Sequence, residues 1–347
     1  MQLQEFLNKS SGFLRLPGHE FLIERMVSKL SNLQNVVLVA HKGWGKSSLI
    51  REVGFRLTDS NKEIQVFYYD MQWVFDRSTF IKTFIQELCR SLSAKIPDLG
   101  NISQLGYENL ELAESIANLR RIKLITFISN FDQIKRFDEN YRELRLLRLI
   151  LIKQRSCAYC ISGSNQPFFE SLFGKAFSPM SPFGRVFYLK RKLDLDYTSY
   201  VRNLFFQSGK RINHQAAMHI TNLTENHFSY INLLSWHAFL RTEYTCTMET
   251  VNSAFRDMIT EFQLHLKSLL ARLTAKQYFY LCALACGLEN ICSREVLKNY
   301  KLGRSSNVAR IRENLLAKEL IELQRKYVII VDPLLRHWLL KEIRSQK

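Results

Sequence analysis

The stretch that decides the fold is VVLVAHKGWGKSSLI, residues 36–50 of a 347-residue chain. Its first four residues are apolar and predict a short buried strand, and a helical pattern begins at Lys46. Between them residues 40–47 read A-H-K-G-W-G-K-S, close to the phosphate-binding pattern G-x-x-x-x-G-K-[ST]. Backbone N–H groups at the start of a helix favour anions. The stretch therefore predicts a nucleotide-binding loop that follows the first strand of a parallel α/β sheet.

The loop pattern assigns a place to each residue. Lys46 would reach the β- and γ-phosphates of ATP or ADP, and the Ser47 hydroxyl would hold Mg²⁺. Ala40 replaces the first glycine, which a negative φ would tolerate. Trp44 stands where a small residue is usual and predicts a bulky outer wall. The residues expected around the nucleotide are His41, Lys42, Gly43, Trp44, Gly45, Lys46, Ser47 and Ser48.

The composition limits the classes of protein to which the chain can belong. Hydrophobic and charged contents of 46% and 23% are those of a soluble globular protein. The apolar runs fall short of the roughly 20 residues of a membrane helix, so we expect no membrane insertion. No signal peptide is visible, and seven cysteines, an odd number, suggest reduced thiols in a cytoplasm. Cys157 and Cys160 form one C-x-x-C without a second pair, which favours strand residues over zinc ligands.

The net charge of +17 makes a polyanionic partner plausible, either nucleic acid or an anionic membrane surface. The plainer alternative is a basic surface that keeps the chain soluble. Charge alone does not choose between them.

The order of elements predicts three domains. Strands at residues 36–39, 64–70, 121–129, 156–162 and 186–189 alternate with helices, which indicates a parallel-sheet P-loop nucleotide-binding domain over residues 1–193. Residues 194–270 contain helical patterns only and predict a helical lid. Residues 271–347 give three helices, a hairpin and a closing helix, which is the order of a winged helix.

The third helix of a winged helix commonly enters the major groove of DNA. Basic residues on or beside this helix, and at the tip of the hairpin, make duplex DNA a candidate partner. The alternative is a winged helix that packs against the ATPase core; a protein partner or self-association is also compatible with this organisation. The candidate DNA-binding residues are Arg304, Arg310, Arg312, Lys318, Arg325 and Lys326.

Six stretches, taken in order, resemble a known group of proteins. They are LPGHEFLIERM, HKGWGKSSL, FISNFDQI, CISGSNQPFFESLF, ENHFSYINLL and VDPLLRHWLL. Over residues 18–340 the chain resembles the prokaryotic P-loop ATPases of the archaeal-ATPase/STAND type, relatives of the origin-recognition AAA+ proteins. The resemblance implies a phosphate loop, an acidic Walker B segment, a sensor strand, a helical lid and a winged helix.

The Walker B segment departs from that family. Its strand usually ends in Asp-Glu, but alignment on Phe131 places Ser129 and Asn130 there. Neither side chain can take a proton from water or hold Mg²⁺ firmly. The first interpretation is therefore a nucleotide-dependent switch of the AAA+/STAND type, with weak or absent hydrolysis.

Two alternatives remain open. Asp132 could replace the lost aspartate and give an active ATPase, although a helix N-cap or a surface carboxylate is its more ordinary role. The second alternative is a DNA-binding or scaffold protein whose phosphate loop is a relic.

Three further residues follow from the resemblance. Asn165, at the end of the sensor stretch Ser162 to Asn165, is a candidate contact for the γ-phosphate or the attacking water. His227 could approach the nucleotide from the lid, with a helix cap or a packed imidazole as the alternative. Arg185 is a candidate finger toward a neighbouring subunit.

Overall fold

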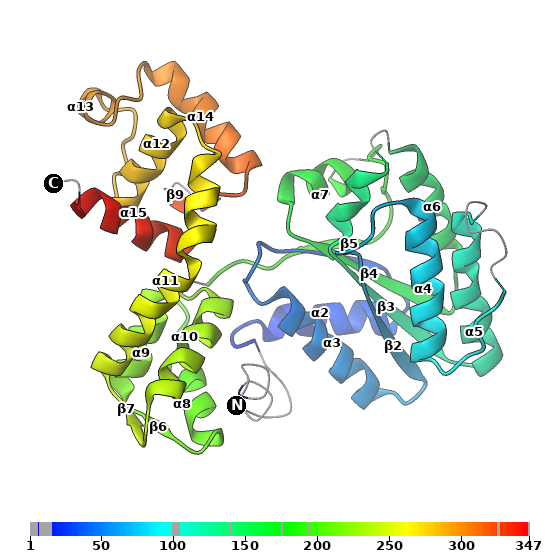
Figure 1. The fold of residues 1–347 in the computed structure, drawn as a ribbon. Coiled ribbons are helices and arrows are strands. Elements are labelled where there is room, and N and C mark those ends of the chain that lie inside the picture. The colour runs from blue at the N-terminus through cyan, green and yellow to red at the C-terminus, as the bar shows by residue number, and fades with distance from the viewer. Residues whose placement is uncertain are drawn as a thin grey trace. The chain divides into compact units, whose positions relative to one another are not determined.

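The computed structural model describes residues 6, 16–98, 105–138, 141–174, 176–192, 194–324 and 327–345. The described chain forms two compact units, one within residues 16–190 and one that contains residues 191–345 together with Phe6 (Figure 1). The second of these units contains the residues of both the predicted lid and the predicted winged helix.

A five-stranded sheet forms the centre of the first unit, in the order β2-β3-β4-β1-β5. Every neighbouring pair is parallel, as the alternation of strands and helices predicted. The strands lie within two residues of their predicted bounds, at β1 (Val36–Val39), β2 (Ile64–Asp70), β3 (Lys123–Ser129), β4 (Cys157–Gly163) and β5 (Arg185–Tyr188). Cys157 and Cys160 are buried residues of β4, and both are free thiols.

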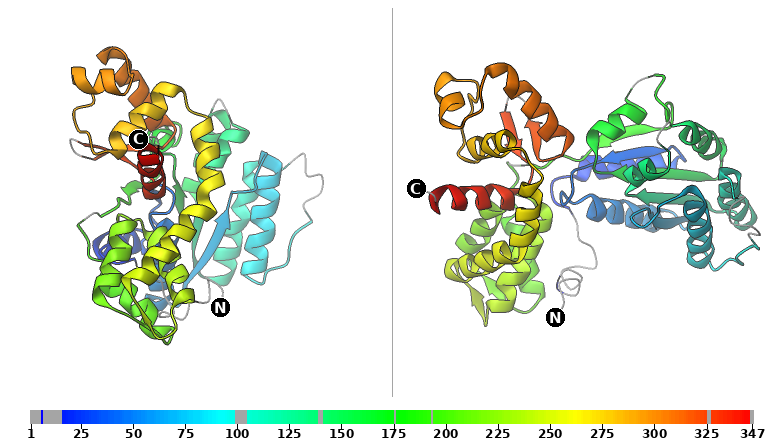
Figure 2. Two further views of the ribbon diagram at one scale, coloured as in Figure 1. Left: turned by 60° about the vertical axis from the view of Figure 1, so that its left-hand side comes forward. Right: turned by 45° about the horizontal axis from the view of Figure 1, so that its top comes forward.

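Helices cover both faces of this sheet (Figures 1 and 2). Residues of four helices share one apolar core with Val37, Val39 and Phe67, and the four are α4 (Arg77–Ser91), α5 (Leu112–Arg120), α6 (Arg142–Lys153) and α7 (Gln166–Phe173). The other face carries α2 (Glu20–Ser31) and α3 (Lys46–Ser60) (Figure 1). Two short 3₁₀ turns, η2 (Tyr107–Glu111) and η3 (Phe131–Arg136), add buried residues to the core shared by α4–α7. Burial of apolar residues on both faces explains why the strands read as nearly continuous hydrophobic runs.

The carboxyl ends of the parallel strands meet at one edge. The Ala40 N–H donates to the Gly163 carbonyl at 3.1 Å, and the Met71 N–H donates to the Ser129 carbonyl at 3.0 Å. The phosphate loop and the ends of β2, β3 and β4 therefore lie side by side, which is where open α/β sheets bind ligands.

The lid of the second unit consists of four helices, α8 (Thr198–Gln207), α9 (His214–Leu223), α10 (Phe228–Arg241) and α11 (Met248–Ala271). It also contains a small parallel sheet of β6 (Arg211–Ile212) and β7 (Thr245–Cys246), which the helices-only expectation missed. Phe6 is buried against this lid, with its ring 4.8 Å from that of Phe239.

The winged helix has the predicted order of elements. Its helices are α12 (Ala275–Ala285), α13 (Arg294–Asn299) and α14 (Ser305–Ala317), followed by the hairpin of β8 (Ile321–Gln324) and β9 (Tyr327–Ile330) and by α15 (Pro333–Ser345). No helix in the described part of the chain is both long and apolar enough to cross a membrane.

Polar contacts of the α15 stretch join the winged helix to the lid. Arg336 donates to Glu225 Oε1 at 2.6 Å, and the Tyr230 hydroxyl donates to Asp332 Oδ2 at 3.0 Å. His337 Nε2 lies 2.9 Å from the Leu223 carbonyl. These contacts give a structural reason for the residue types in VDPLLRHW, and α15 lies beside α11 in both views of Figure 2.

Candidate functional site

The phosphate loop turns through two left-handed glycines. Gly43 has φ 79° and Gly45 has φ 95°, and both conformations favour glycine. Helix α3 begins at Lys46, directly after Gly45, so the N–H groups of its first turn have no acceptor within the helix. The loop thus has the turn chemistry of an anion site at the start of a helix.

Lys46 is the charged side chain of this loop that lies partly buried. Within the part of the chain that the structure describes, its ammonium makes no hydrogen bond and no ion pair. Burial lowers the pKa of Lys46, while the negative charges of Asp132 and then Asp70 act in the opposite direction. An ammonium in this position is desolvated without direct compensation, which a bound anion would supply.

Asp132 is half-buried, its negative charge acts on this lysine, and it does not cap the turn that follows β3. The cap position of η3 belongs to Asn130, without a side-chain hydrogen bond. Asp132 Oδ1 is fully buried and has no hydrogen-bond partner among the described residues. The sequence could not show this, because η3 turns back over the end of the sheet only in the folded chain.

Gly163, the last residue of β4, makes room for that carboxylate. A Cβ atom at this position would lie 2.5 Å from Asp132 Oδ1 and 2.4 Å from the ring of Phe169. Any larger residue would therefore displace Asp132 or the aromatic ring behind it.

Asp70 is a site residue that the sequence analysis missed. It ends β2 beside Ser129, its partner in the register of β3. Its Oδ1 accepts from Asn130 Nδ2 at 2.7 Å and from the Gln72 N–H at 2.9 Å. An acidic residue at the carboxyl end of a strand next to the Walker B strand was the available signal. Asn130, which the sequence resemblance aligned with the family's glutamate, is thus hydrogen-bonded to Asp70.

Trp44 does not form the outer wall that was expected. It is only 4% exposed, and its ring packs edge-on against that of His41 at 4.6 Å. The indole therefore lies inside the loop. Lys42 and Ser47 are exposed, and Ser48 is half-buried, so the loop residues keep different access to solvent.

The sensor stretch continues β4 into α7. Ser162 and Ser164 are buried, and Asn165 caps α7 by accepting from the Phe168 N–H at 3.0 Å. The capping uses the side-chain oxygen and leaves the amide nitrogen of Asn165 to other contacts. Arg185 starts β5, opposite Val36 in the register, and so lies at the amino edge of the sheet, away from the phosphate loop.

His227 lies in the second unit, at the start of α10. It is 5% exposed, and its ring stacks on Tyr230 at 4.2 Å. Asn226, with φ 58°, donates to the carbonyls of Lys192 and Leu195 at 3.0 and 2.7 Å. The ring of His227 is therefore a packed imidazole. The turn before it, through the Asn226 side chain, hydrogen-bonds to the backbone that leads into the lid.

The basic residues of the winged helix do not form one surface. Arg304, Arg310 and Lys318 are exposed, and so is Arg312. Two positions apart on α14, Arg310 and Arg312 point about 200° apart around the helix. Arg312 lines a groove beside β9, whereas Arg310 does not. Arg325 and Lys326 lie outside the described residues.

Comparison with known proteins supports this architecture. Residues 264–341 match the family model described as "Probable winged helix domain". No curated protein matches the sequence.

Solved structures match over nearly the whole chain. The Walker-type ATPase of Pyrococcus abyssi is 12% identical with a TM-score of 0.74, over 93% of this chain and 96% of that one. The ORC2 protein of Aeropyrum pernix is 11% identical with a TM-score of 0.69, over 97% and 96%. The ORC1 protein of the same organism, in complex with DNA, is 15% identical with a TM-score of 0.50, over 96% and 95%. The chain therefore has the fold of the P-loop ATPases of the origin-recognition type, with a C-terminal winged helix.

Proposed function

We propose that the chain binds ATP or ADP with Mg²⁺ at the loop of residues 41–48 and acts as a nucleotide-dependent switch with slow or absent hydrolysis. The observation that carries the proposal is the partly buried Lys46, which has no ion pair among the described residues. A buried ammonium is costly unless a counter-charge meets it. A β- or γ-phosphate at the start of α3 would be that counter-charge.

The rest of the loop fits the same ligand. The N–H groups of Lys46, Ser47 and Ser48, in the first turn of α3, can donate to phosphate oxygens. The two left-handed glycines on the N-terminal side allow the backbone to turn closely around them. The similar ORC2 protein was solved as ADPNP–ADP complexes, which supports the same ligand class.

The residues present also fit Mg²⁺, which prefers oxygen ligands and keeps several waters. The Ser47 hydroxyl and the Asp132 carboxylate are the side chains that would hold it. Bound there, the ion would neutralise phosphate charge. The unpaired Oδ1 of Asp132 is the observation that favours this assignment.

Slow hydrolysis follows from the side chains at the end of β3. Ser129 and Asn130 replace the carboxylates of the family, and an amide cannot act as a general base. Asn130 instead donates to Asp70, so its side chain is already engaged. General acid–base groups contribute about 10²–10⁴-fold in rate, and we expect a loss of that order.

The second candidate function is an active ATPase in which Asp132 is the Walker B acid. The burial of Asp132 Oδ1 and its charge interaction with Lys46 favour this alternative. In both candidate functions Asp132 would act at the nucleotide site. They differ only in whether the protein activates a water molecule to attack the γ-phosphate.

DNA binding by the winged helix is a further candidate partner interaction. The similar ORC1 protein was solved in complex with DNA, and Arg304, Arg310 and Lys318 of this chain are exposed on or beside α14. This interaction is separate from the nucleotide site and needs its own test.

The test of the nucleotide site measures binding and hydrolysis independently. We expect Lys46→Ala to weaken ATP affinity at least tenfold in calorimetry, about 1.4 kcal/mol, because it removes the charge aimed at the phosphates. The matched control is Lys62→Ala, which removes an exposed lysine just before β2, at the edge of the sheet opposite the loop, and should change affinity little. Equal ATP affinity in the parent and the Lys46→Ala variant would make the loop a relic and overturn the proposal.

A further inference from the structure

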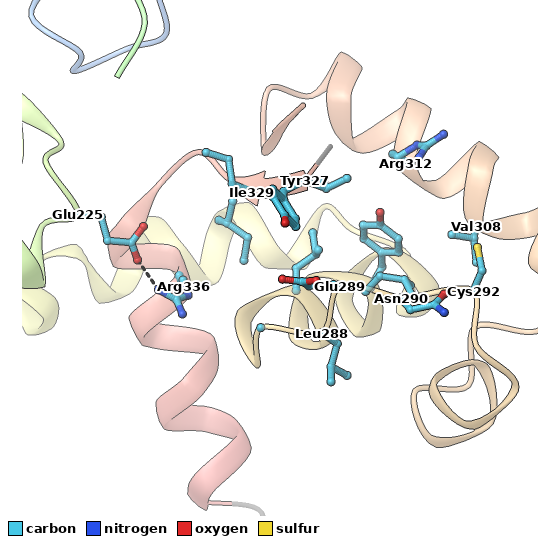
Figure 3. A pocket seen from close by; sticks show the side chains of 16 residues that line it. Glu225, Leu288, Glu289, Asn290, Cys292, Val308, Arg312, Tyr327, Ile329 and Arg336 are labelled. Atoms are coloured by element: carbon cyan, nitrogen blue, oxygen red, sulfur yellow. Dashed lines mark hydrogen bonds and ion pairs between the residues drawn. The ribbon is translucent and has the colours of Figure 1, made fainter. Parts of the chain in front are cut away.

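A groove of about 620 Å³ lies in the winged helix, beside the hairpin (Figure 3). Its lining includes all four residues of β9 and none of the described residues of β8, so the groove follows the outer side of β9. The opposite wall is the loop of residues 287–292, and Tyr280 and Leu284 of α12 form part of the floor. The volume is that of a site for a ligand of several hundred daltons.

The outer edge of β9 presents unpaired backbone groups to this groove. Val331 N–H donates to the Leu320 carbonyl at 3.0 Å, which makes that pair a hydrogen-bonded one. Pairs alternate in an antiparallel ladder, so Val328 and Ile330 belong to the pairs without mutual hydrogen bonds. Their N–H and C=O groups therefore point away from β8. Among the described residues they have no partner.

Among the described residues, the opposite wall also has backbone N–H groups without a partner. The loop is held through the Leu288 N–H to the Ala283 carbonyl at 3.2 Å and the Ser293 N–H to the Asn290 carbonyl at 3.1 Å. Glu289 and Asn290 are exposed at its centre, where Figure 3 shows them facing the groove. The hairpin edge and the loop thus form two polar walls around a partly apolar floor.

The charges at the two ends of the groove differ. At one end Arg336 forms a 2.6 Å ion pair with Glu225, whose other oxygen pairs with Arg191 at 3.7 Å. At the other end Arg312 lines the groove without an ion pair among the described residues. A ligand that fills the groove would therefore meet one free positive charge, on the side of α14.

We propose that this groove binds an extended peptide segment of a partner protein, which adds a strand to β9 and places an acidic side chain against Arg312. Addition of a strand to an exposed sheet edge uses main-chain hydrogen bonds for affinity and side-chain pockets for specificity. The outward N–H and C=O groups of Val328 and Ile330 would supply the main-chain hydrogen bonds. The floor of the groove and Arg312 would supply the specificity. Strands rise about 3.3 Å per residue, so a segment of about four residues would cover β9.

The lining argues against a nucleic acid as the occupant of this groove. Glu225 and Glu289 both lie along it, and Glu289 has no ion pair among the described residues. Phosphates would be repelled by that carboxylate, whereas a peptide backbone carries no net charge. The peptide is therefore the ligand that matches both the unpaired strand edge and the mixed charge.

The experiment selects peptides from a random twelve-residue phage library against the full chain and measures the binding of the selected peptides by fluorescence anisotropy. We expect enriched peptides with alternating β-branched residues and one acidic residue. Arg312→Glu should weaken their binding at least tenfold by reversing the charge that meets the acidic residue.

A matched pair of proline variants tests the strand edge. Val328→Pro removes an outward N–H from β9, and Leu323→Pro removes one from its cross-strand partner on β8, both without loss of a ladder hydrogen bond. Val328→Pro should abolish peptide binding and Leu323→Pro should leave it intact, with thermal melting as the check that both variants fold.

Two results would overturn the proposal. One is equal peptide binding by the two proline variants, which would exclude the edge of β9. The other is a selection that yields no peptide whose binding is weakened by Arg312→Glu, together with weaker binding of duplex DNA by that variant. This pair of results would assign Arg312 to a nucleic-acid surface.

Discussion

The carboxyl edge of the core sheet and helix α14 of the winged helix both carry positive charge, but they hold it differently. Lys46 is partly buried, desolvated and faced by Asp132. Arg304, Arg310 and Lys318 are exposed, and their charges are solvated. A buried charge costs free energy unless a counter-charge compensates it, whereas an exposed lysine or arginine costs little. The comparison teaches that the desolvated charge at the sheet edge, which has no ion pair among the described residues, favours the proposed nucleotide, while the solvated charge on α14 requires no ligand.

The largest expected effect is on hydrolysis at the sheet edge. Ser129→Asp together with Asn130→Glu should raise ATP turnover about 100-fold, because it restores a carboxylate able to activate water. Turnover is measured with labelled ATP under single-turnover conditions. No gain in turnover, with ATP binding unchanged, would mean that the register of β3 against the family's Walker B strand is wrong.

Asp132→Asn in the parent separates the two candidate functions. This isosteric change removes the charge and should lower the Mg²⁺-dependent part of ATP affinity while it changes the slow turnover little. A parent that hydrolyses ATP readily and loses this activity in the variant would instead identify Asp132 as the catalytic acid of an active ATPase.

Much of this edge could be predicted from the sequence because local patterns determine it. The apolar strand before Lys46 and the glycines around Trp44 specify the loop by themselves. Asp132 could not be placed in the same way, because its position depends on the turn of η3 and on the missing Cβ of Gly163. Asp70 reaches the site only through the pairing of β2 with β3, which is a contact between segments far apart in the chain.

The sequence likewise could not predict which individual side chains are buried. Trp44 packs on His41 inside the loop, although its position in the motif suggested an outer wall. The strands β6 and β7 contain two residues each, too few to show an alternating pattern. In the winged helix the sequence predicted the order of elements. It did not show which face of α14 is buried, so the surroundings of Arg310 and Arg312 could not be predicted. The structure shows that Val308, Ile311 and Leu315 form that face.

A smaller expected effect concerns the binding of DNA and tests the exposed charges of α14. We expect Arg310→Ala to reduce the slope of log affinity against log salt by about one unit for a duplex at low salt, because one phosphate contact is lost. Arg312→Ala is the matched control and should leave the slope unchanged, since its side chain lines the groove beside β9. The reverse result would place the nucleic-acid surface along the hairpin and erase the distinction between the two arginines.

The smallest expected effect concerns a buried group whose partner is internal. His337 is half-buried in the second unit, where its Nε2–H donates to the Leu223 carbonyl and its ring packs edge-on against Phe255 at 5.0 Å. Burial lowers the pKa of His337 below 6.5, opposed by the Leu223 carbonyl and the charge of Glu225 and reinforced by that of Arg336. The unfolded chain therefore binds the proton more readily than the folded one. The contribution to stability is complete above the unfolded pKa of 6.5 and is lost as the pH falls from there through the lower folded pKa.

His337→Gln removes this titration and keeps a side-chain donor for the carbonyl. We expect the parent to lose more thermal stability than the variant between pH 7.5 and pH 5.5, because only the parent takes up this proton on unfolding. Differential scanning calorimetry of both proteins at the two pH values gives the measurement. An equal loss in both would show that protonation of His337 is not coupled to folding. A measured difference would show that His337, whose ring nitrogen is satisfied by a carbonyl of the chain, stabilises the fold in its neutral form. Lys46 has no hydrogen bond or ion pair among the described residues, and it remains the partly buried charge for which we propose a nucleotide as the partner.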